Sequence, residues 1–427
     1  MRPNVIKIIC HDIGKHLGCY GVKSVSTLAI DNLAKQGALF TNAFATSPGC
    51  SPSRSALATG RYPHNTGVLG LAHGHFGWKL NKKIHHISKY FSNHDYTTSL
   101  FGLQHITYQE ESLGFGKIFP ERSADDVVKN LKNNLGNKFL KKPFYAEINF
   151  FEPHRPFDFG GVKPFTSKGI FVPQYIPTNT HSRKEFAAMQ GAIKKMDESI
   201  LEIIKILKKK NLYQNTIILF TTDHGIPFPR AKGTLFDAGI ETGLIIHYPK
   251  IKHKLKNKNK KFNQLISNID ILPTLLDFAK IKIPKTIQGK SFYPLLLGKK
   301  YKENTTIFAE KTYHEGFDPI RCVRNHNYKL IINFDSDRTI RVPSDIMNGG
   351  TYKTMLDKLI NVRERFELYN IQLDKYENYN LANKDDFKLI KNELMKKIKK
   401  WMKDTKDPLY SSKIQSPYLL DTLRELK

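Results

Sequence analysis

The sequence predicts an α/β fold in which a large, mainly parallel sheet is sandwiched by helices and a smaller C-terminal domain adds an antiparallel sheet and a helix. Apolar runs of buried-strand length alternate with long amphipathic helical segments, which is typical of parallel sheets covered on both faces. Each apolar run ends in polar residues, and from about residue 305 the pattern changes to short strands and one helix. A chain of 427 residues is long enough for two domains, which we predict at 1–300 and 301–427.

Four apolar runs are expected to form the central strands of the large sheet. With their polar ends they lie at 4–10, 144–154, 215–225 and 242–249. Helices are predicted at 26–37 and 185–211, and the second is closed by lysines that suit a helix C-terminus. Because connections this long return the chain for a parallel strand, the polar strand ends should meet at one edge, where such sheets bind ligands.

The segments after residue 250 are expected to complete the fold. The lysine- and asparagine-rich stretch at 250–262 is predicted as an exposed loop, and 267–281 as a helix with Pro273 in its first turn. The smaller domain is predicted to contain strands at 305–313, 320–334 and 365–371 and an amphipathic helix at 386–404.

Composition and charge argue against several classes of function. The formal net charge of +29 favours anionic partners, but the lysines are spread along the chain and no nucleic-acid-binding module is recognisable, so we expect no nucleic acid partner. Four cysteines without a CxxC pair argue against a disulfide framework or a zinc knuckle. No stretch approaches the roughly 20 apolar residues of a membrane span. Because the start also lacks the features of a signal peptide, a cytoplasmic location is expected.

One cysteine lies where a helix is expected to begin, in "GCSPSRSALATG" at 49–60. Ser51 and Pro52 are suitable N-cap and first-turn residues, and Gly60 is a suitable end. Cys50 is therefore expected at a helix N-terminus, where backbone N–H groups favour anions and lower the pKa of a thiol. Arg54, one turn further on, can add a fixed positive charge. A buried structural cysteine is the alternative.

The stretch from Cys50 to Arg54, with "ALATGRYPHNTG" after it, resembles the C-x-P-x-R signature of type I sulfatases, which belong to the alkaline phosphatase superfamily. Further blocks resemble that family in its order: "HDIGKHLGCYG", "PHRPF", "TTDHGIPFPRAKGTLFDAGIETG", "SNIDILPTLLDFA", "QGKSFYPLLLG" and "ELYNIQLDKYENYNLA". "DHGIPFP" and "AEKTYHE" are most similar to its heparan N-sulfatase branch. The resemblance covers nearly the whole chain. It implies an alkaline phosphatase-like fold and hydrolysis of sulfate esters or sulfamates of a sulfated sugar.

The resemblance also implies a modified nucleophile. In the family, a formylglycine-generating enzyme recognises C-x-P-x-R and oxidises its cysteine, so Cys50 is expected to become formylglycine. A hydrated aldehyde offers one hydroxyl to attack sulfur and a second that can expel sulfate. The implied partners are therefore this modifying enzyme and a sulfated small molecule or oligosaccharide.

A divalent metal is implied at His11, Asp12, Cys50, Asp223 and His224. The family holds calcium with a D-D pair and a D-N pair, so Asp12 and Asp223 match the pattern whereas His11 and His224 depart from it. Calcium prefers oxygen ligands, while imidazole suits zinc, manganese or iron. Calcium is the expected ion, with two alternatives open: the histidines ligate a softer ion, or they stand aside while Asp12, Asp223 and the modified Cys50 hold calcium.

Four positions match the family's charged and proton-transferring residues. Arg54 corresponds to the arginine that steadies the formylglycine hydroxyl, and Lys232 to a cation on a sulfate oxygen. His154 corresponds to the histidine that contacts sulfate and assists the leaving group, and His105 to one that takes a proton from the second hydroxyl. Leu103 replaces the lysine of the family's G-K-x-H motif. Either His11 or a neighbouring lysine compensates for that charge, or turnover is weakened.

The smaller domain is expected to contact the sugar. "KTYHEGFDPIRCVR" resembles the family's contact region, and its candidate residues are Tyr313, His314, Arg321 and Arg324, with ordinary positions in a sheet as the alternative. The motifs do not distinguish S–O from S–N bonds. Two other functions stay open: a phosphomonoester or phosphonate hydrolase of the same superfamily, and a non-catalytic anion-binding relative.

Overall fold

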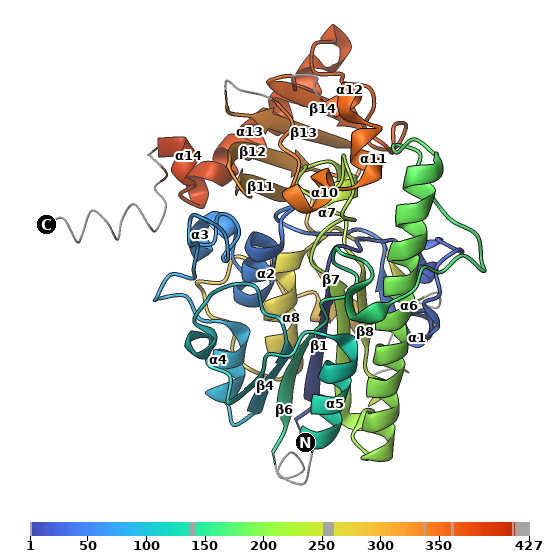
Figure 1. The fold of residues 1–427 in the computed structure, drawn as a ribbon. Coiled ribbons are helices and arrows are strands. Elements are labelled where there is room, and N and C mark those ends of the chain that lie inside the picture. The colour runs from blue at the N-terminus through green and yellow to red at the C-terminus, as the bar shows by residue number, and fades with distance from the viewer. Residues whose placement is uncertain are drawn as a thin grey trace, which may run out of the picture.

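The computed structural model describes residues 2–135, 142–250, 260–335, 339–359, 363–411 and 414. Figure 1 shows a large sheet between two layers of helices, with a small sheet beyond the carboxyl ends of its central strands. The large sheet has the strand order β5-β4-β6-β1-β7-β8-β2-β9. Its strands are β1 (Asn4–Cys10), β2 (Ala38–Phe40), β4 (Thr97–Gly102), β5 (Lys117–Phe119), β6 (Phe144–Asn149), β7 (Thr216–Thr222), β8 (Leu244–His247) and β9 (Lys261–Phe262).

The predicted mainly parallel sheet is confirmed. β1 pairs in parallel with β6 and β7, and β4 pairs in parallel with β5 and β6, whereas β8 is antiparallel to its neighbours β7 and β2. Successive side chains of a strand point to opposite faces of the sheet, and here both faces are buried. Ile6 and Ile8 of β1 belong to the core on one face, and Val5 and Ile9 belong to the core on the other.

Helices cover both faces of this sheet, as predicted. Ile6 and Ile8 share their core with α1, α5 and α6, while Val5 and Ile9 share theirs with α2, α4 and α8. The helices of this part are α1 (Leu28–Gln36), α2 (Cys50–Thr59), α3 (Pro63–Thr66), α4 (Ile87–Ser92), α5 (Ala124–Asn134), α6 (Thr180–Lys209), α7 (Asp237–Ile240), α8 (Ile271–Phe278) and α9 (Tyr293–Leu296). Two short strands, β3 (Ala43–Phe44) and β10 (Ile266–Ser267), form a separate parallel pair.

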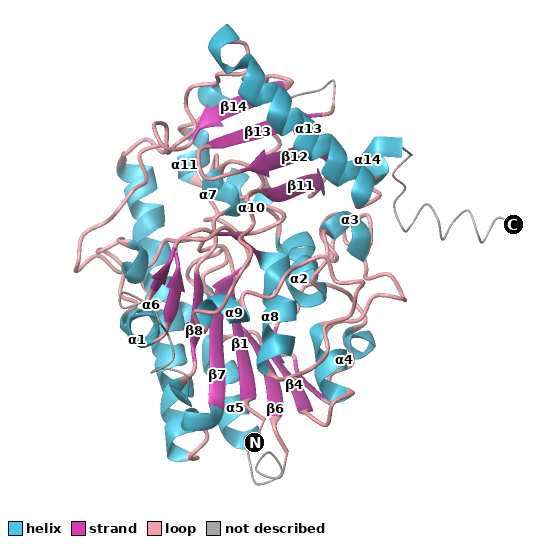
Figure 2. Ribbon diagram, turned by 180° about the vertical axis from the view of Figure 1, so that it is seen from behind, coloured by secondary structure: helices cyan, strands magenta, loops and turns pink. Residues whose placement is uncertain are grey.

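The small sheet is antiparallel, with the order β11-β12-β13-β14. Its strands are β11 (Ile307–Tyr313), β12 (Phe317–Arg324), β13 (Tyr328–Asn333) and β14 (Phe366–Asn370). The nearby helices are α10 (Ser344–Met347), α11 (Gly350–Lys353), α12 (Leu356–Leu359), α13 (Lys388–Asp404) and α14 (Pro408–Ser411). Figure 2 shows α13 lying across the sheet, where Trp401 packs with Val323. Cys322, on the opposite face, packs with Leu235 of the large part. The predicted antiparallel sheet with a helix is therefore confirmed.

Two helix starts differ from the prediction. The N-cap of α2 is Gly49 in an extended conformation, so Cys50 is the first helical residue and Ser51 lies inside the helix. Gly60 ends it with φ +64°, as expected. α6 begins before its apolar pattern because Asn179 and Ser182 form a capping box.

Three further expectations concern the lysine-rich stretch, membrane-spanning helices and the domain boundary. Residues 251–259 of the lysine-rich stretch lie outside the described residues, while Lys261 and Phe262 form β9. In the described part of the chain, every helix is too short or too polar to cross a bilayer. The boundary between residues 300 and 301 stays a prediction.

Candidate active site

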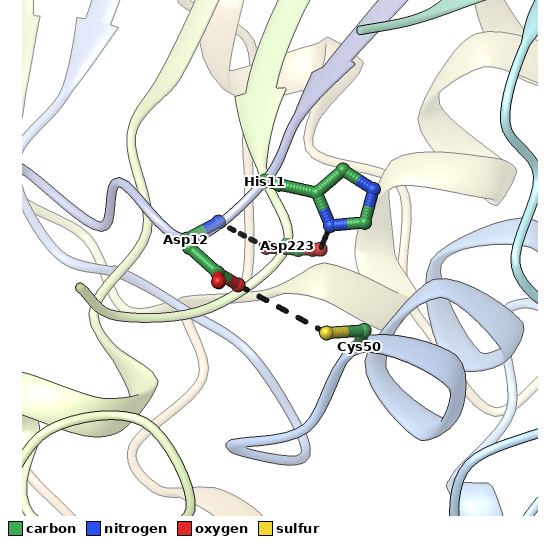
Figure 3. A group of neighbouring side chains, drawn as sticks. All are labelled: His11, Asp12, Cys50 and Asp223. Carbon is green, nitrogen blue, oxygen red and sulfur yellow. Dashed lines mark hydrogen bonds and ion pairs between the residues drawn. The ribbon is translucent and has the colours of Figure 1, made fainter. Parts of the chain in front are cut away.

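Two carboxylates meet where β1 and β7 end. Asp12 follows β1 with a φ of +51°, a left-handed conformation that Asp tolerates better than most residues. Asp223 follows β7, and its Oδ1 accepts the N–H of Asp12 at 3.0 Å and that of His224 at 2.9 Å. Both side chains are completely buried. Parallel pairing thus brings together two residues 211 positions apart in the sequence (Figure 3).

α2 presents Cys50 to these carboxylates. Its Sγ lies 3.9 Å from Oδ1 of Asp12 and 3.2 Å from Nε2 of His224. The start of α2 also packs closely against His314: a Cβ at Gly49 would lie only 3.1 Å from the ring of that histidine, so glycine suits this position. Burial acts to raise the pKa of the Cys50 thiol, but the positive charges of Lys232 and His224 outweigh it and hold that pKa well below its ordinary value.

Arg54 ties α2 to the strand ends. Its Nε donates to Oδ2 of Asp223 at 2.9 Å, and its Nη1 donates to Oδ1 of Asn149 at 3.0 Å. The same Nη1 contacts the carbonyl of Leu103 at 3.3 Å. Burial acts to raise the pKa of Asp223, but His224 and Arg54 hold it well below the ordinary value. Asp223 is therefore an anion at neutral pH.

Lys232 lies on the other side of Asp12. Its Nζ is 2.8 Å from Oδ2 of Asp12, 2.8 Å from Oδ2 of Asp345 and 3.3 Å from Nε2 of His154. Burial acts to lower the pKa of Lys232, but Asp12 and the other nearby anions raise it well above its ordinary value. A permanent ammonium group thus stands beside the nucleophile candidate.

Histidines line the remaining side of the site. Nδ1 of His154 lies 2.5 Å from the carbonyl of Arg155, and a carbonyl only accepts, so Nδ1 carries a proton and Nε2 faces Asp12 and Lys232. His105 has a φ of +58°, and its ring centroid is 6.0 Å from that of His11. Besides Lys232 and His224, His105 and His11 also act against burial to lower the pKa of the Cys50 thiol. Three histidines, His11, His105 and His154, therefore lie around the buried thiol of Cys50.

Comparison with known proteins identifies the family. A family model described as "Sulfatase" matches residues 3–281, which is more than half of the chain. The chain belongs to the sulfatase family. A second model, described as "N-sulphoglucosamine sulphohydrolase, C-terminal", matches residues 230–342.

Individual relatives agree with this assignment. An ulvan-active sulfatase of Formosa agariphila is 30% identical over 98% of this chain and 83% of its own length. The N-sulphoglucosamine sulphohydrolase of Homo sapiens is 25% identical over 95% of this chain and 91% of its own. Among solved structures, a 2-O GAG sulfatase superposes with a TM-score of 0.75 at 23% identity, covering 97% of this chain and 95% of that one. The phosphonate monoester hydrolase of Agrobacterium radiobacter gives 0.72 at 19% identity, with 95% and 96% covered. The predicted family, fold class and enzyme class, a sulfuric ester hydrolase, are thereby confirmed.

The sulfatase site has donors suited to a divalent cation. One ligand atom each from His11, Asp12, Cys50 and Asp223 lies within 4.8 Å of the others. His224 adds a fifth, because its Nε2 is 3.1 Å from Oδ1 of Asp12. Nδ1 of His11 lies 3.2 Å from Oδ2 of Asp223 (Figure 3) and is buried without a hydrogen bond to any described residue. Two carboxylates and an unpartnered imidazole nitrogen fit a divalent metal, which sulfatases generally use.

The predicted sugar contacts separate into two groups. His314 is 7% exposed and borders the site through Gly49, and Tyr313 beside it packs on Trp78 with ring centroids 5.0 Å apart. Arg321 was expected at the mouth of the pocket, but it is 0% exposed and donates to Asp407.

Arg324 also has a different place from the one predicted. It is paired with Asp237 at 2.9 Å and lines a cavity of about 920 Å³ whose described lining includes neither Cys50 nor Lys232. Both arginines sit on β12, where neighbouring side chains alternate between two buried faces. The strand therefore uses them in structural ion pairs.

Two residues of this site were not predicted from the sequence. Asn149, which accepts from Arg54, ends β6, and the rule that polar strand ends collect at one edge could have found it. Asp345, which pairs with Lys232, lies on the short helix α10 in a segment without a motif. Nothing in the sequence pattern pointed to it.

Proposed function

We propose that this sulfatase hydrolyses sulfate ester or sulfamate groups of a sulfated sugar, with a formylglycine made from Cys50 as nucleophile and a bound divalent metal. The observation that supports this most directly is the position of Cys50 in the first turn of α2, where its Sγ is close to both the carboxylate of Asp12 and the imidazole of His224. Similarity to an ulvan-active sulfatase and to an N-sulphoglucosamine sulphohydrolase supports a sulfated glycan as substrate.

The residues around Cys50 would divide the work of sulfuryl transfer. A hydrated aldehyde at position 50 supplies one hydroxyl that attacks sulfur and a second that expels sulfate. Lys232, held charged by its anionic neighbours, would bind a sulfuryl oxygen as negative charge spreads over that group. Arg54 would hold the nucleophile side of the site, because Asp223 and Asn149 fix its guanidinium.

Proton transfer would use two partly buried histidines near the nucleophile, His154 and His105. Nε2 of His154 faces the space beside Lys232, where the leaving group must lie if Lys232 binds the sulfuryl oxygens. It would protonate the leaving atom. His105 would accept a proton when sulfate is released.

For the metal we propose calcium, held by the carboxylates of Asp12 and Asp223 and by position 50 after its conversion to an oxygen ligand. A softer ion such as manganese is the second candidate, because His224 offers an imidazole nitrogen. Its Nδ1 donates to the carbonyl of Gly225 at 3.0 Å, so Nε2, 3.1 Å from Oδ1 of Asp12, is the nitrogen that could bind a metal in exchange for its proton. Elemental analysis of the purified protein would decide between the two ions.

The decisive experiment joins modification with turnover. The chain is co-expressed with a formylglycine-generating enzyme, the peptide carrying Cys50 is weighed by mass spectrometry, and hydrolysis of an aryl sulfate and an aryl phosphate is compared. We expect an aldehyde at position 50 and faster hydrolysis of the sulfate. A persistent thiol would contradict the nucleophile, and faster hydrolysis of the phosphate would support the phosphomonoester alternative.

A further inference from the structure

The carboxylate of Asp345 is fixed at the outer side of the active site. It lies on α10, between the two sheets (Figure 1). The backbone N–H and the hydroxyl of Ser344 donate to Glu315 at 3.0 and 2.6 Å. Pro343 packs on the turn after Lys232, where Gly233 has a φ of +82° and a Cβ would lie 3.0 Å from the proline ring. The segment around α10 thus holds the carboxylate of Asp345 against the ammonium group of Lys232.

The position of Asp345 relative to the reacting groups is specific. Its Oδ2 lies 2.8 Å from Nζ of Lys232 and 3.9 Å from Nε2 of His154. The side chain is 20% exposed, whereas that of Asp12, on the other side of the same lysine, is 0% exposed. Asp345 therefore faces the solvent side, from which the sugar must enter, next to the histidine assigned to the leaving atom.

A carboxylate at this place distinguishes two kinds of leaving group. When an S–O bond breaks, its electron pair stays on oxygen, and negative charge grows there until a proton arrives. When the S–N bond of a sulfamate breaks, the pair stays on a basic nitrogen, which takes a proton and leaves as an amine. A fixed anion repels the first charge distribution and attracts the second. The sulfamate N–H can also donate to a carboxylate, whereas the bridging oxygen of a sulfate ester carries no hydrogen.

We propose that Asp345 makes this sulfatase selective for the S–N bond of a sulfamate by accepting a hydrogen bond from the nitrogen that leaves. The proposal rests on the function assigned to Cys50 above. In the net reaction, R–NH–SO₃⁻ and water give R–NH₂ and HSO₄⁻. His154 donates the proton to nitrogen, and the sulfuryl group passes to one hydroxyl at position 50. The second hydroxyl then expels hydrogen sulfate and restores the aldehyde, which takes up the water of the net reaction. The N-sulfated amino sugars are the matching substrate class.

The test compares two substrates in two proteins. The formylglycine-containing enzyme and its Asp345→Asn variant are assayed with glucosamine N-sulfate and glucosamine 6-O-sulfate. We expect the unaltered enzyme to prefer the N-sulfate in kcat/KM, and the substitution to lower that preference about tenfold or more. Asp357→Asn, which changes an exposed carboxylate of α12, is the matched control and should leave the ratio unchanged.

Other outcomes separate the possible failures. A preference of the unaltered enzyme for the 6-O-sulfate, or an equal loss on both substrates in Asp345→Asn, would overturn the selectivity and leave Asp345 as a residue that positions Lys232. Absence of turnover of any sulfate by protein that carries the aldehyde would instead overturn the proposed function. Thermal unfolding of both variants checks that the comparison is made on folded protein.

Discussion

Sγ of Cys50 lies 3.2 Å from Nε2 of His224, so an imidazole borders the thiol that we propose is converted to formylglycine. The carbonyl of Gly225 accepts from the other ring nitrogen of His224 and orients the ring. The family pattern to which the sequence was compared has an amide at this position. The histidine therefore brings a nitrogen donor into a site of carboxylates, and this bears directly on the metal.

His224→Asn should shift metal selectivity toward calcium. The substitution replaces a nitrogen donor by an amide oxygen. Calcium prefers oxygen donors, and this preference is weaker for manganese. We expect the ratio of calcium to manganese affinity to rise about tenfold, measured by calorimetric titration of metal-stripped protein. His326→Asn, on a half-exposed histidine paired with Glu303, serves as control. An unchanged ratio in His224→Asn would show that His224 stands aside from the ion.

Arg321→Lys should lower stability and leave catalysis unchanged. Arg321 donates from Nε and Nη2 to both carboxylate oxygens of Asp407, at 2.5 and 2.9 Å, and a lysine cannot reproduce this two-point contact. We expect a loss of about 1–3 kcal/mol in the free energy of unfolding. Denaturant unfolding measures it, and kcat/KM per folded molecule is the second readout. A raised KM at unchanged stability would restore the role in sugar binding that the sequence had predicted for Arg321.

Sequence patterns were sufficient for the parts of the site that lie on regular elements. The apolar runs located β1 and β7, and the rule that ligands collect at the carboxyl ends of parallel strands placed Asp12 and Asp223 together. The helix-start residues located α2 to within two positions. The N-cap is Gly49 and not the predicted Ser51. Gly49 packs closely against His314, and a tertiary contact of this kind is not visible in the local sequence.

The small sheet shows where sequence patterns fail. In β12, Ile320 and Cys322 face one core and Val323 faces the other, so each side of the strand combines apolar residues with an arginine. Because both faces are buried, the alternation of polar and apolar residues that assigns a strand to a face is lost. Asp345 could not be predicted either, because it lies on the short helix α10 in a segment without a motif, and only the fold brings it to Lys232.

His16→Phe should reduce the loss of stability in acid. His16 is 4% exposed and lies between Phe171 and Phe186, with ring centroids 5.7 and 5.5 Å away, and burial lowers its pKa to about 4. Between about pH 6.5 and 4 the unfolded chain protonates this histidine while the folded chain does not. Stability is thus fully present above pH 6.5 and falls as the pH falls toward 4, by about 3 kcal/mol at the lower end.

The measurement for His16 is urea unfolding at pH 7 and pH 4.5 for both proteins. The difference between the two pH values should be smaller in His16→Phe than in the unaltered protein, whatever other groups contribute to each curve. Equal differences in both proteins would mean that the buried ring is protonated in the folded state.

A buried ion pair in the large sheet lies close to the active site and can be used to test how the sheet supports that site. Lys7 of β1 and Glu147 of β6 are register partners, with Nζ 2.8 Å from Oε2 and side chains 0% and 1% exposed. Burial acts to raise the pKa of Glu147, but Lys7 and then His86 lower it to about 2. Asn149, two residues further along β6, contacts Arg54, so the pair lies directly behind the site.

Removing one partner should cost more than removing both. Lys7→Met leaves an unpaired carboxylate in the core, and we expect a loss of about 3–5 kcal/mol in the free energy of unfolding. In the double variant Lys7→Met, Glu147→Leu no charge remains to be buried, so stability should return most of the way, less the hydrogen bond that Glu147 accepts from Tyr145. Denaturant unfolding of both single variants and the double variant gives the coupling energy. Additive losses would show that water reaches the pair. Retained kcat in the double variant would show that the pair supports the fold without setting the position of Arg54.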